Sequence, residues 1–347
     1  MSVLKPQRLR PGDKVAIVSL SRGMLGEEQF IHKYHLAKER LERDYGLQVV
    51  AMPNALKGID YLYRHPEARA QDLTDAFRDP EIKAVFNAIG GDDTIRLLPH
   101  IDFDVLRRNP KIFTGFSDTT TNHFMMYKAG LASYYGGAVM NNWAEYGAIN
   151  EYTAEAFDKT LFHPQDAWTI PASGFCSYET DKVWWDEANI NQTIPRFPNG
   201  GYEVLQGEGK ASGPLLGGCI DVFEMLFGTS LWPSPEEWRG KLLLLETSED
   251  DIGPDWLTWF LRGLQAQGVL HAVNGIVVGK PAFADKLEPY KEVYRQVVGF
   301  EAGLPNLPIL YNVNVGHAYP IGLFPLGLEY EIDCGAKTLT LLEPATR

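Results

Sequence analysis

Short, uninterrupted apolar runs alternate with charged, helix-like stretches along the first third of the chain. The apolar runs cover residues 14–21, 47–52 and 84–89, and the stretches between them cover 27–45 and 66–79. Continuous apolar runs of this length are typical of strands buried on both faces, and their alternation with helices favours a mainly parallel sheet. The sequence therefore predicts an α/β fold with an N-terminal Rossmann-like domain, in which ligands bind beyond the carboxyl ends of the strands.

The amino-acid composition argues against several classes of function. The 347 residues carry a formal net charge of −13, which argues against nucleic acid as a partner because phosphate binding needs concentrated Lys and Arg. Three distant cysteines form neither a metal spacing nor a disulfide framework, so we expect a reducing, cytoplasmic setting. No run reaches the roughly 18 apolar residues that a membrane span needs, and we expect no membrane partner.

The segment 111–120 holds the most informative turn. An apolar strand at 112–113 leads through Gly115 and Ser117 into a helix-like stretch that begins at Thr119. A serine on a sharp strand-to-helix turn exposes its hydroxyl and aims neighbouring N–H groups at one point, which suits a nucleophile. The alternative is that Ser117 or Asp118 simply caps the helix.

A second turn follows the strand at 84–89, with the sequence Gly90-Gly91-Asp92-Asp93. If both turns lie on the same sheet edge, the glycines let the backbone approach the Ser117 hydroxyl closely. A plain left-handed turn with a helix cap is the alternative reading.

Two further candidates stand at strand ends in the second half. Glu246 follows four leucines, an expensive place for a charge unless it is paired, and His317 ends an apolar run that begins at 308. A serine hydroxyl needs a base, and the base needs a group that fixes its tautomer. Ser117, His317 and Glu246 could fill these roles, although a solvent-facing glutamate and a structural histidine are the alternatives. No metal, phosphate-loop or dinucleotide motif is present in the sequence.

Between these halves lies a stretch rich in Pro, Gly, Asn and aromatic residues. We predict a first domain over 1–165, a linker with an aromatic loop over 166–210, and a second domain over 211–347. The adjacent Trp184 and Trp185 argue against disorder. They could stack on a planar ligand or pack between the domains.

These motifs, taken in order, resemble the LD-carboxypeptidase family of serine peptidases, which includes murein-recycling LD-carboxypeptidases and microcin C self-immunity peptidases. The resemblance extends over nearly the whole chain and rests on Gly90-Gly91-Asp92-Asp93, Gly115-Phe116-Ser117-Asp118-Thr119, 213–221, Leu245-Glu246 and Gly316-His317. It implies a C-terminal domain of β-barrel type, a site between the domains, a homodimer, and no metal or cofactor.

The resemblance also implies roles for individual residues. Ser117 would be the nucleophile, His317 the general base and Glu246 its orienting partner. The N–H of Asp118, with one from the Gly91 turn, would form the oxyanion hole. The residues expected to contact substrate are Asp92, Trp184 and Trp185.

The aromatic stretch is more similar to the microcin C immunity branch, whose substrates are aminoacyl or peptidyl adenylate mimics. Cys219 stands where the murein branch generally has asparagine, which weakens but does not exclude a murein carboxypeptidase that releases D-alanine. A binding protein that kept the fold without catalysis is the third reading.

Overall fold

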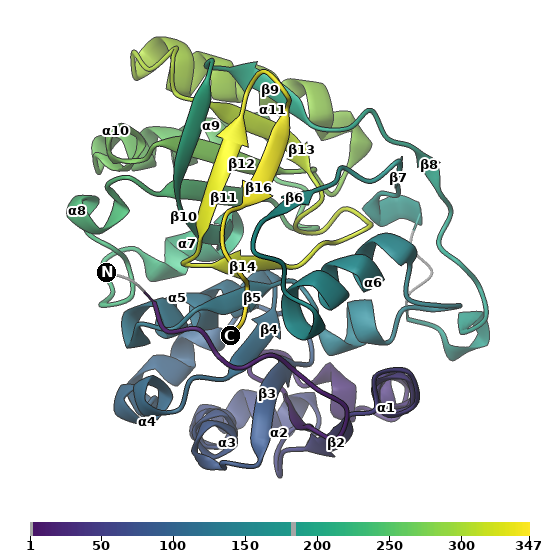
Figure 1. Ribbon diagram of the computed structural model, residues 1–347. Coiled ribbons are helices and arrows are strands. Elements are labelled where there is room, and N and C mark those ends of the chain that lie inside the picture. Colours follow the sequence, from purple (N-terminus) through teal and green to yellow (C-terminus); the bar gives the residue numbers. More distant parts are fainter. Residues whose placement is uncertain (1–2, 182–184) are drawn as a thin grey trace.

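The structure is a computed structural model that describes residues 3–181 and 185–347. Figure 1 shows the first sheet with its helices in the lower half and the second sheet with α9 and α11 in the upper half. The two chain ends lie side by side, since the N–H of Arg8 donates to the carbonyl of Arg347 at 3.0 Å and the N–H of Arg347 donates to Pro6 at 2.9 Å.

Six strands form the first sheet, in the order β14-β5-β4-β3-β1-β2. The first five in the chain pair in parallel and β14 is antiparallel to β5. The strands are β1 (Lys14–Val18), β2 (Gln48–Ala51), β3 (Ile82–Asn87), β4 (Ile112–Gly115), β5 (Ser133–Tyr135) and β14 (Phe324–Leu326). The predicted parallel sheet is confirmed, and its strands are buried as the continuous apolar runs require.

Helices connect these strands. They are α1 (Ile31–Tyr45), α2 (Ile59–Arg64), α3 (Pro66–Arg78), α4 (Phe103–Arg108) and α5 (Thr120–Ala129), with the short turns η1 (Met24–Gly26), η2 (Thr94–His100) and η3 (Ser117–Thr119). After β5 come the π-helical η4 (Val139–Trp143), then α6 (Glu151–Phe157) and its π-helical continuation η5 (Asp158–Phe162). The buried Trp143 ring stacks on Phe157 with centroids 3.9 Å apart, which fixes this segment against the sheet.

Eight strands form the second sheet, in the order β6-β16-β15-β10-β11-β12-β13-β9. The strands are β6 (Trp168–Ile170), β9 (Glu203–Gln206), β10 (Lys210–Cys219), β11 (Leu242–Glu246), β12 (Gly275–Gly279), β13 (Ile309–Val313), β15 (Glu329–Asp333) and β16 (Thr338–Leu341). The four strands from β10 to β13 run in parallel and the outer strands are antiparallel. The C-terminal region, for which the resemblance implied a domain of β-barrel type, thus forms a second, mixed sheet.

Helices of the second half accompany this sheet. They are α7 (Ile220–Leu226), α8 (Pro235–Trp238), α9 (Pro254–Ala266), α10 (Val269–Ala272), η8 (Ala284–Lys286), α11 (Leu287–Tyr294) and the π-helical η9 (Arg295–Glu301). Apolar side chains from both halves join one buried cluster, as Phe124 of α5 and Phe223 of α7 show with ring centroids 5.6 Å apart. Within residues 3–181 and 185–347, none of the helices is both long and apolar enough to cross a membrane.

The stretch 166–210 differs from the linker and loop that we predicted. It supplies β6 and β9, the two end strands of the second sheet, as well as a small sheet of β7 (Phe175–Cys176) and β8 (Phe197–Pro198). Short turns η6 (Glu179–Asp181) and η7 (Glu187–Asn189) lie between β7 and β8. Strands of two to four residues carry no readable alternation, which is why the sequence pattern did not reveal them.

Candidate active site

The turn after β4 holds Ser117 in a left-handed backbone conformation, with a φ of +63°. This conformation costs roughly 1–2 kcal/mol for a residue with a Cβ, and such strain is concentrated at functional sites. Gly90 faces this serine, because a Cβ built on Gly90 would lie 2.6 Å from Ser117 Cβ and 2.8 Å from its Oγ. The predicted close approach of the glycine turn is thus confirmed, and a side chain at position 90 would displace the serine.

Asp118 does not act as the helix cap that was the alternative reading. Neither η3 nor α5 has a side-chain cap among the described residues. Instead, Asp118 Oδ2 accepts hydrogen bonds from the Ser21 hydroxyl, from the N–H of Asp93 at 3.0 Å, and from the N–H and hydroxyl of Thr94 at 2.9 and 2.6 Å. One carboxylate oxygen therefore ties the serine turn to two other loops.

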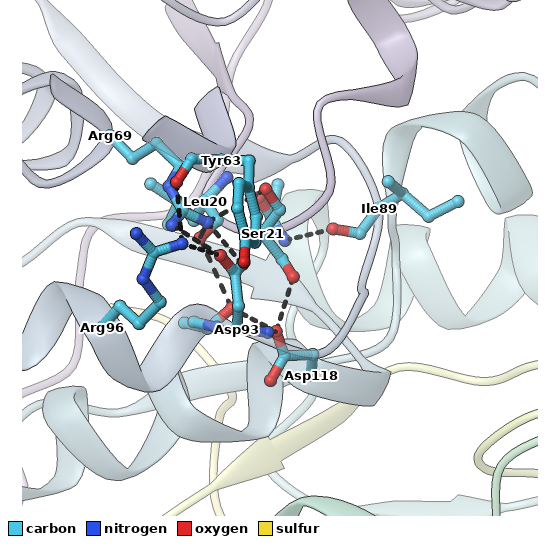
Figure 2. A network of polar contacts seen from close by, with 10 residues as sticks. Leu20, Ser21, Tyr63, Arg69, Ile89, Asp93, Arg96 and Asp118 are labelled. Carbon is cyan, nitrogen blue, oxygen red and sulfur yellow. Dashed lines mark hydrogen bonds and ion pairs between the residues drawn. The ribbon is translucent and has the colours of Figure 1, made fainter. Parts of the chain in front are cut away.

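Figure 2 shows how this network continues from Asp118 through Asp93 to two arginines. The buried Arg69 guanidinium binds both carboxylate oxygens of Asp93, at 2.7 and 2.9 Å, and Arg96 adds a contact at 2.9 Å. Burial raises the pKa of Asp118, although the hydrogen bonds from Ser21 and Thr94 act in the opposite direction. Buried polar contacts therefore help to hold the loops behind Ser117.

The second half of the site joins Glu246, the last residue of β11, to His317. Glu246 Oε2 lies 2.8 Å from His317 Nδ1, and both side chains are buried. The Tyr135 hydroxyl donates to the other oxygen of Glu246 and accepts from the N–H of Ser117 at 3.2 Å. Because an ionised carboxylate only accepts hydrogen bonds, Nδ1 carries a proton, so Nε2 is the nitrogen that can act as a base whenever the imidazole is neutral.

Gly316 permits this approach. Its φ is +96°, and a Cβ at this position would collide with the Glu246 carboxylate. Any side chain here would strain the backbone and push Glu246 from His317. The Phe116 ring meets the imidazole edge to face, with centroids 5.1 Å apart, and further restricts its orientation.

Ser117 and His317 line the same cavity, whose volume is about 230 Å³. Its walls are formed by Arg22, Met24, Ile89, Gly90, Gly91, Phe116, Ser117, Asn141, Glu179, Trp185, Glu249 and His317. The structure thus brings together Ser117, His317, Glu246 and the Gly91 turn, four elements that lie far apart in the sequence.

The residues that we expected to contact the substrate do not all line this cavity. Trp185 lines the cavity, with its ring 6.0 Å from Phe30 in an edge-to-face arrangement. Asp92 is exposed and lines a neighbouring hollow with Ser21 and Tyr63 instead. Trp184 lies outside the described residues.

Sequence reasoning missed Tyr135 and Glu249. Glu249 Oε2 lies 3.2 Å from His317 Nε2, on the opposite side of the ring from Glu246. Asp250 is nearby, and burial together with the negative charge of Glu249 raises its pKa. The run Ser248-Glu249-Asp250-Asp251 after β11 was the available signal, because a strand-end loop rich in acids falls beside the predicted histidine.

The site also contains a group of residues that could bind a metal ion. Ligand atoms of Cys219, Glu246 and His317 all lie within 4.8 Å of one another, and all three residues are buried. Burial raises the pKa of the Cys219 thiol well above its usual value, and the nearby Glu246 and Asp221 carboxylates act in the same direction.

The mixed α/β fold, with a serine turn and a carboxylate-bound histidine facing one cavity, is that of a hydrolase of the serine carboxypeptidase type. The chain belongs to the LD-carboxypeptidase family: residues 15–136 match the LD-carboxypeptidase N-terminal domain, and residues 212–332 match the LD-carboxypeptidase C-terminal domain. The resemblance seen in the sequence is therefore confirmed.

Known proteins named as carboxypeptidases and known MccF-like proteins are both similar to the chain. YocD of Bacillus subtilis, a provisionally named carboxypeptidase, is 32% identical over 345 residues, covering 95% of this chain and 96% of its own. The crystal structure of an MccF-like protein from Streptococcus pneumoniae in complex with AMP has a TM-score of 0.88 and 34% identity, covering 95% of this chain and 98% of that one. The microcin C7 self-immunity protein MccF in complex with aspartyl sulfamoyl adenosine has a TM-score of 0.86 and 26% identity, covering 99% and 100%.

Proposed function

We propose that this chain is a serine peptidase that hydrolyses the amide bond of aminoacyl or peptidyl nucleotides of the microcin C type, as a self-immunity or detoxification enzyme. The observation that carries the proposal is the Glu246–His317 hydrogen bond beside a cavity that Ser117, His317 and Trp185 share. The similar structures bind AMP or an aminoacyl sulfamoyl nucleoside, which supports a nucleotide in the cavity.

In this mechanism the Ser117 hydroxyl oxygen attacks the substrate carbonyl carbon while His317 Nε2 accepts the hydroxyl proton. Glu246 keeps the other ring nitrogen protonated and stabilises the imidazolium that forms. The N–H of Asp118 and one from the Gly91 turn donate to the developing oxyanion. His317 then gives its proton to the leaving nitrogen. A water molecule next attacks the acyl-enzyme while His317 Nε2 accepts its proton, and His317 returns that proton to Ser117 Oγ as the acyl–oxygen bond breaks.

Glu249 must release the imidazole before this reaction can begin. A ring held between two ionised carboxylates can donate to both only as an imidazolium, which is not a base. The side chain of Glu249 is about half exposed, at 54%, so it can leave Nε2 at little cost in burial. We infer that substrate entering the cavity displaces Glu249 and leaves Nε2 facing Ser117.

Trp185 is the proposed contact for the nucleobase. Its ring lies on the cavity wall, and a planar base gains about 1–3 kcal/mol by stacking on an aromatic side chain. We expect Trp185→Ala to raise KM about tenfold for an adenosine-linked substrate, and to change KM far less for an aminoacyl amide that lacks the base. An equal rise for both substrates would contradict the stacking role.

Incubation of the purified protein with aspartyl sulfamoyl adenosine tests the proposal directly. We expect free aspartate and sulfamoyl adenosine from the wild-type protein, and a loss of several orders of magnitude in kcat for Ser117→Ala. A fluorophosphonate probe should label the wild type and not Ser117→Ala. Labelling without turnover would contradict the substrate, and absence of both would indicate a binding protein that kept the fold.

A murein LD-carboxypeptidase is the second candidate, because the matching domains carry that family description and YocD is named as a carboxypeptidase. Release of D-alanine from a murein tetrapeptide distinguishes it from the first. We also propose a homodimer, which light scattering would show as twice the chain mass of 38.9 kDa.

A further inference from the structure

We propose that Cys219, Glu246 and His317 form an inhibitory site for a thiophilic divalent cation such as Zn²⁺. The cation would not be a cofactor of hydrolysis. It would hold the candidate base and its carboxylate in an inactive arrangement. Binding itself is independent of the proposed substrate, and only the inhibition rests on the proposed function.

The sheet register places two of the ligands side by side. Cys219 ends β10 and Glu246 ends β11, and the two residues are direct partners in this parallel pair. Partners in neighbouring strands direct their side chains to the same face of the sheet. His317 reaches that face from the loop after β13, so all three ligand atoms lie within 4.8 Å of one another.

The chemistry of the ligands suits Zn²⁺, which binds cysteine sulfur, histidine nitrogen and carboxylate oxygen. Zn–S and Zn–N bonds of about 2.3 and 2.0 Å place tetrahedral ligand atoms roughly 3.5 Å apart. Atoms that now lie up to 4.8 Å apart would approach by about 1 Å, and His317 Nδ1 and Glu246 Oε2, now 2.8 Å apart, would separate slightly. His317 lines the cavity and provides the route of entry. Catalytic zinc sites likewise have three protein ligands and an open fourth position that takes solvent.

The charges around the thiol favour a cation. Cys219 Sγ lies 3.2 Å from Asp221 Oδ2, and Asp221 is in turn fixed by the N–H of Ser248 at 2.9 Å. The same carboxylates that disfavour a thiolate next to them would stabilise a divalent ion in place of the thiol proton. Binding would release that proton and form the sulfur–metal bond without any change in oxidation state.

The consequence for catalysis follows from the tautomer of His317. Nδ1 is the ring nitrogen on the side of Glu246, and a metal bound there replaces its proton. A neutral imidazole then carries its proton on Nε2, which becomes a donor and cannot accept the proton of Ser117. The cation would therefore inhibit hydrolysis without touching the serine.

Titration of the full-length protein with Co²⁺, in the absence of substrate, tests the site. We expect one equivalent to bind, with a thiolate-to-cobalt charge-transfer band that Zn²⁺ removes. The band should be lost in Cys219→Ser and in Cys219→Ala, whose folding is checked by circular dichroism. It should persist in the matched controls Cys176→Ser and Cys334→Ser. A band that survives in a folded Cys219 variant, or no band in the wild type, would overturn the proposal.

The inhibition is measured as the Zn²⁺ concentration that halves each variant's own metal-free rate. We expect this concentration to rise at least tenfold in the Cys219 variants, because removing even an outer-shell partner of a metal typically costs 10- to 100-fold in affinity. A chelator should restore the wild-type rate. Equal inhibition of wild type and Cys219 variants would show that the thiol is no ligand and would overturn the proposal.

Discussion

The two halves of the site each depend on one buried carboxylate, and the two carboxylates act differently. Asp118 accepts hydrogen bonds from Ser21, Asp93 and Thr94, which are loop groups of the first half, and so determines where the backbone of the serine turn lies. Glu246 accepts from Tyr135 and His317, and so determines where a proton lies. Changes at the first should therefore appear mainly in folding stability, and changes at the second mainly in rate.

The largest effect is expected from Glu246→Gln. The amide can present its N–H₂ group to His317 Nδ1 and favour the wrong tautomer, so kcat should fall about 10³- to 10⁴-fold while KM changes little. Release of aspartate measures the rate, and thermal unfolding should show an intact fold. Glu249→Gln is the matched control on the other ring nitrogen, and it should keep at least a tenth of the activity. Equal losses of kcat in the two variants would contradict a special role for Glu246 in placing the proton.

Asp118→Ala should give the next largest effect, on stability. It leaves the hydroxyls of Ser21 and Thr94 and two N–H groups without their acceptor, and each unsatisfied buried group costs about 1–3 kcal/mol. We expect the free energy of unfolding to fall by at least about 3 kcal/mol in urea denaturation.

Asp118→Asn is the control, because its amide oxygen can replace Oδ2 and its nitrogen can replace Oδ1, which has no partner among the described residues. The raised pKa of Asp118 means that the folded state binds a proton above pH 3.8, where the unfolded state has lost it. Wild-type stability should therefore fall relative to Asp118→Asn as pH rises from 3.8 through the folded pKa. A loss in the opposite direction would contradict the burial argument.

The sequence predicted the first half of the site better than the second. Gly90 and Ser117 follow β3 and β4, which are neighbours both in the chain and in the sheet, so their meeting could be expected from a parallel fold alone. Glu246 and His317 follow β11 and β13, which are separated by β12. Two signals indicated that they meet. A charge that follows four leucines needs a partner, and the family resemblance gives these two residues linked roles.

Three further features of the structure left no pattern in the local sequence. Tyr135 lies in a three-residue strand, and its partner Glu246 is 111 residues away. The sequence did not predict β10 as a ten-residue strand, because its glycines interrupt the apolar pattern. Gly217 approaches β11 so closely that a Cβ would collide with the Leu244 carbonyl. β14 leaves the C-terminal half to join the first sheet, an exchange that only tertiary packing determines.

Lys33 offers a third test. It contacts aromatic rings, including that of Trp185 on the cavity wall, whereas the earlier tests concern the carboxylates Asp118 and Glu246. Its ammonium is fully buried, 3.8 Å from the Tyr146 ring centre and 5.7 Å from that of Trp185. Burial lowers the pKa of Lys33 to about 7; the positive charge of Arg40 acts in the same direction and the Glu145 carboxylate opposes it. Between pH 7 and 10.5 the unfolded state thus binds a proton that the folded state lacks.

Stability of the wild type should therefore rise with pH across this window, by at most about 1.4 kcal/mol per pH unit, and the increase should be absent in Lys33→Met. Urea denaturation at pH 7 and pH 9 gives the two slopes. We expect the difference between the variants to change by about 2 kcal/mol, and parallel stability profiles would show that Lys33 stays charged when folded. The rate at pH 7 serves as the control, since neither carboxylate is altered.

The smallest effect, and the one that joins the halves, is expected from Tyr135→Phe. The Tyr135 hydroxyl binds Glu246 of the second sheet and the N–H of Ser117 in the first, so its loss should lower kcat about tenfold, or about 1.4 kcal/mol in the barrier. If it acts by orienting Glu246, Tyr135→Phe should slow the Glu246→Gln enzyme far less than the wild type, giving a coupling energy near 1 kcal/mol. A full tenfold loss in both backgrounds would mean that the hydroxyl acts on the serine turn alone, and that the two carboxylates work independently.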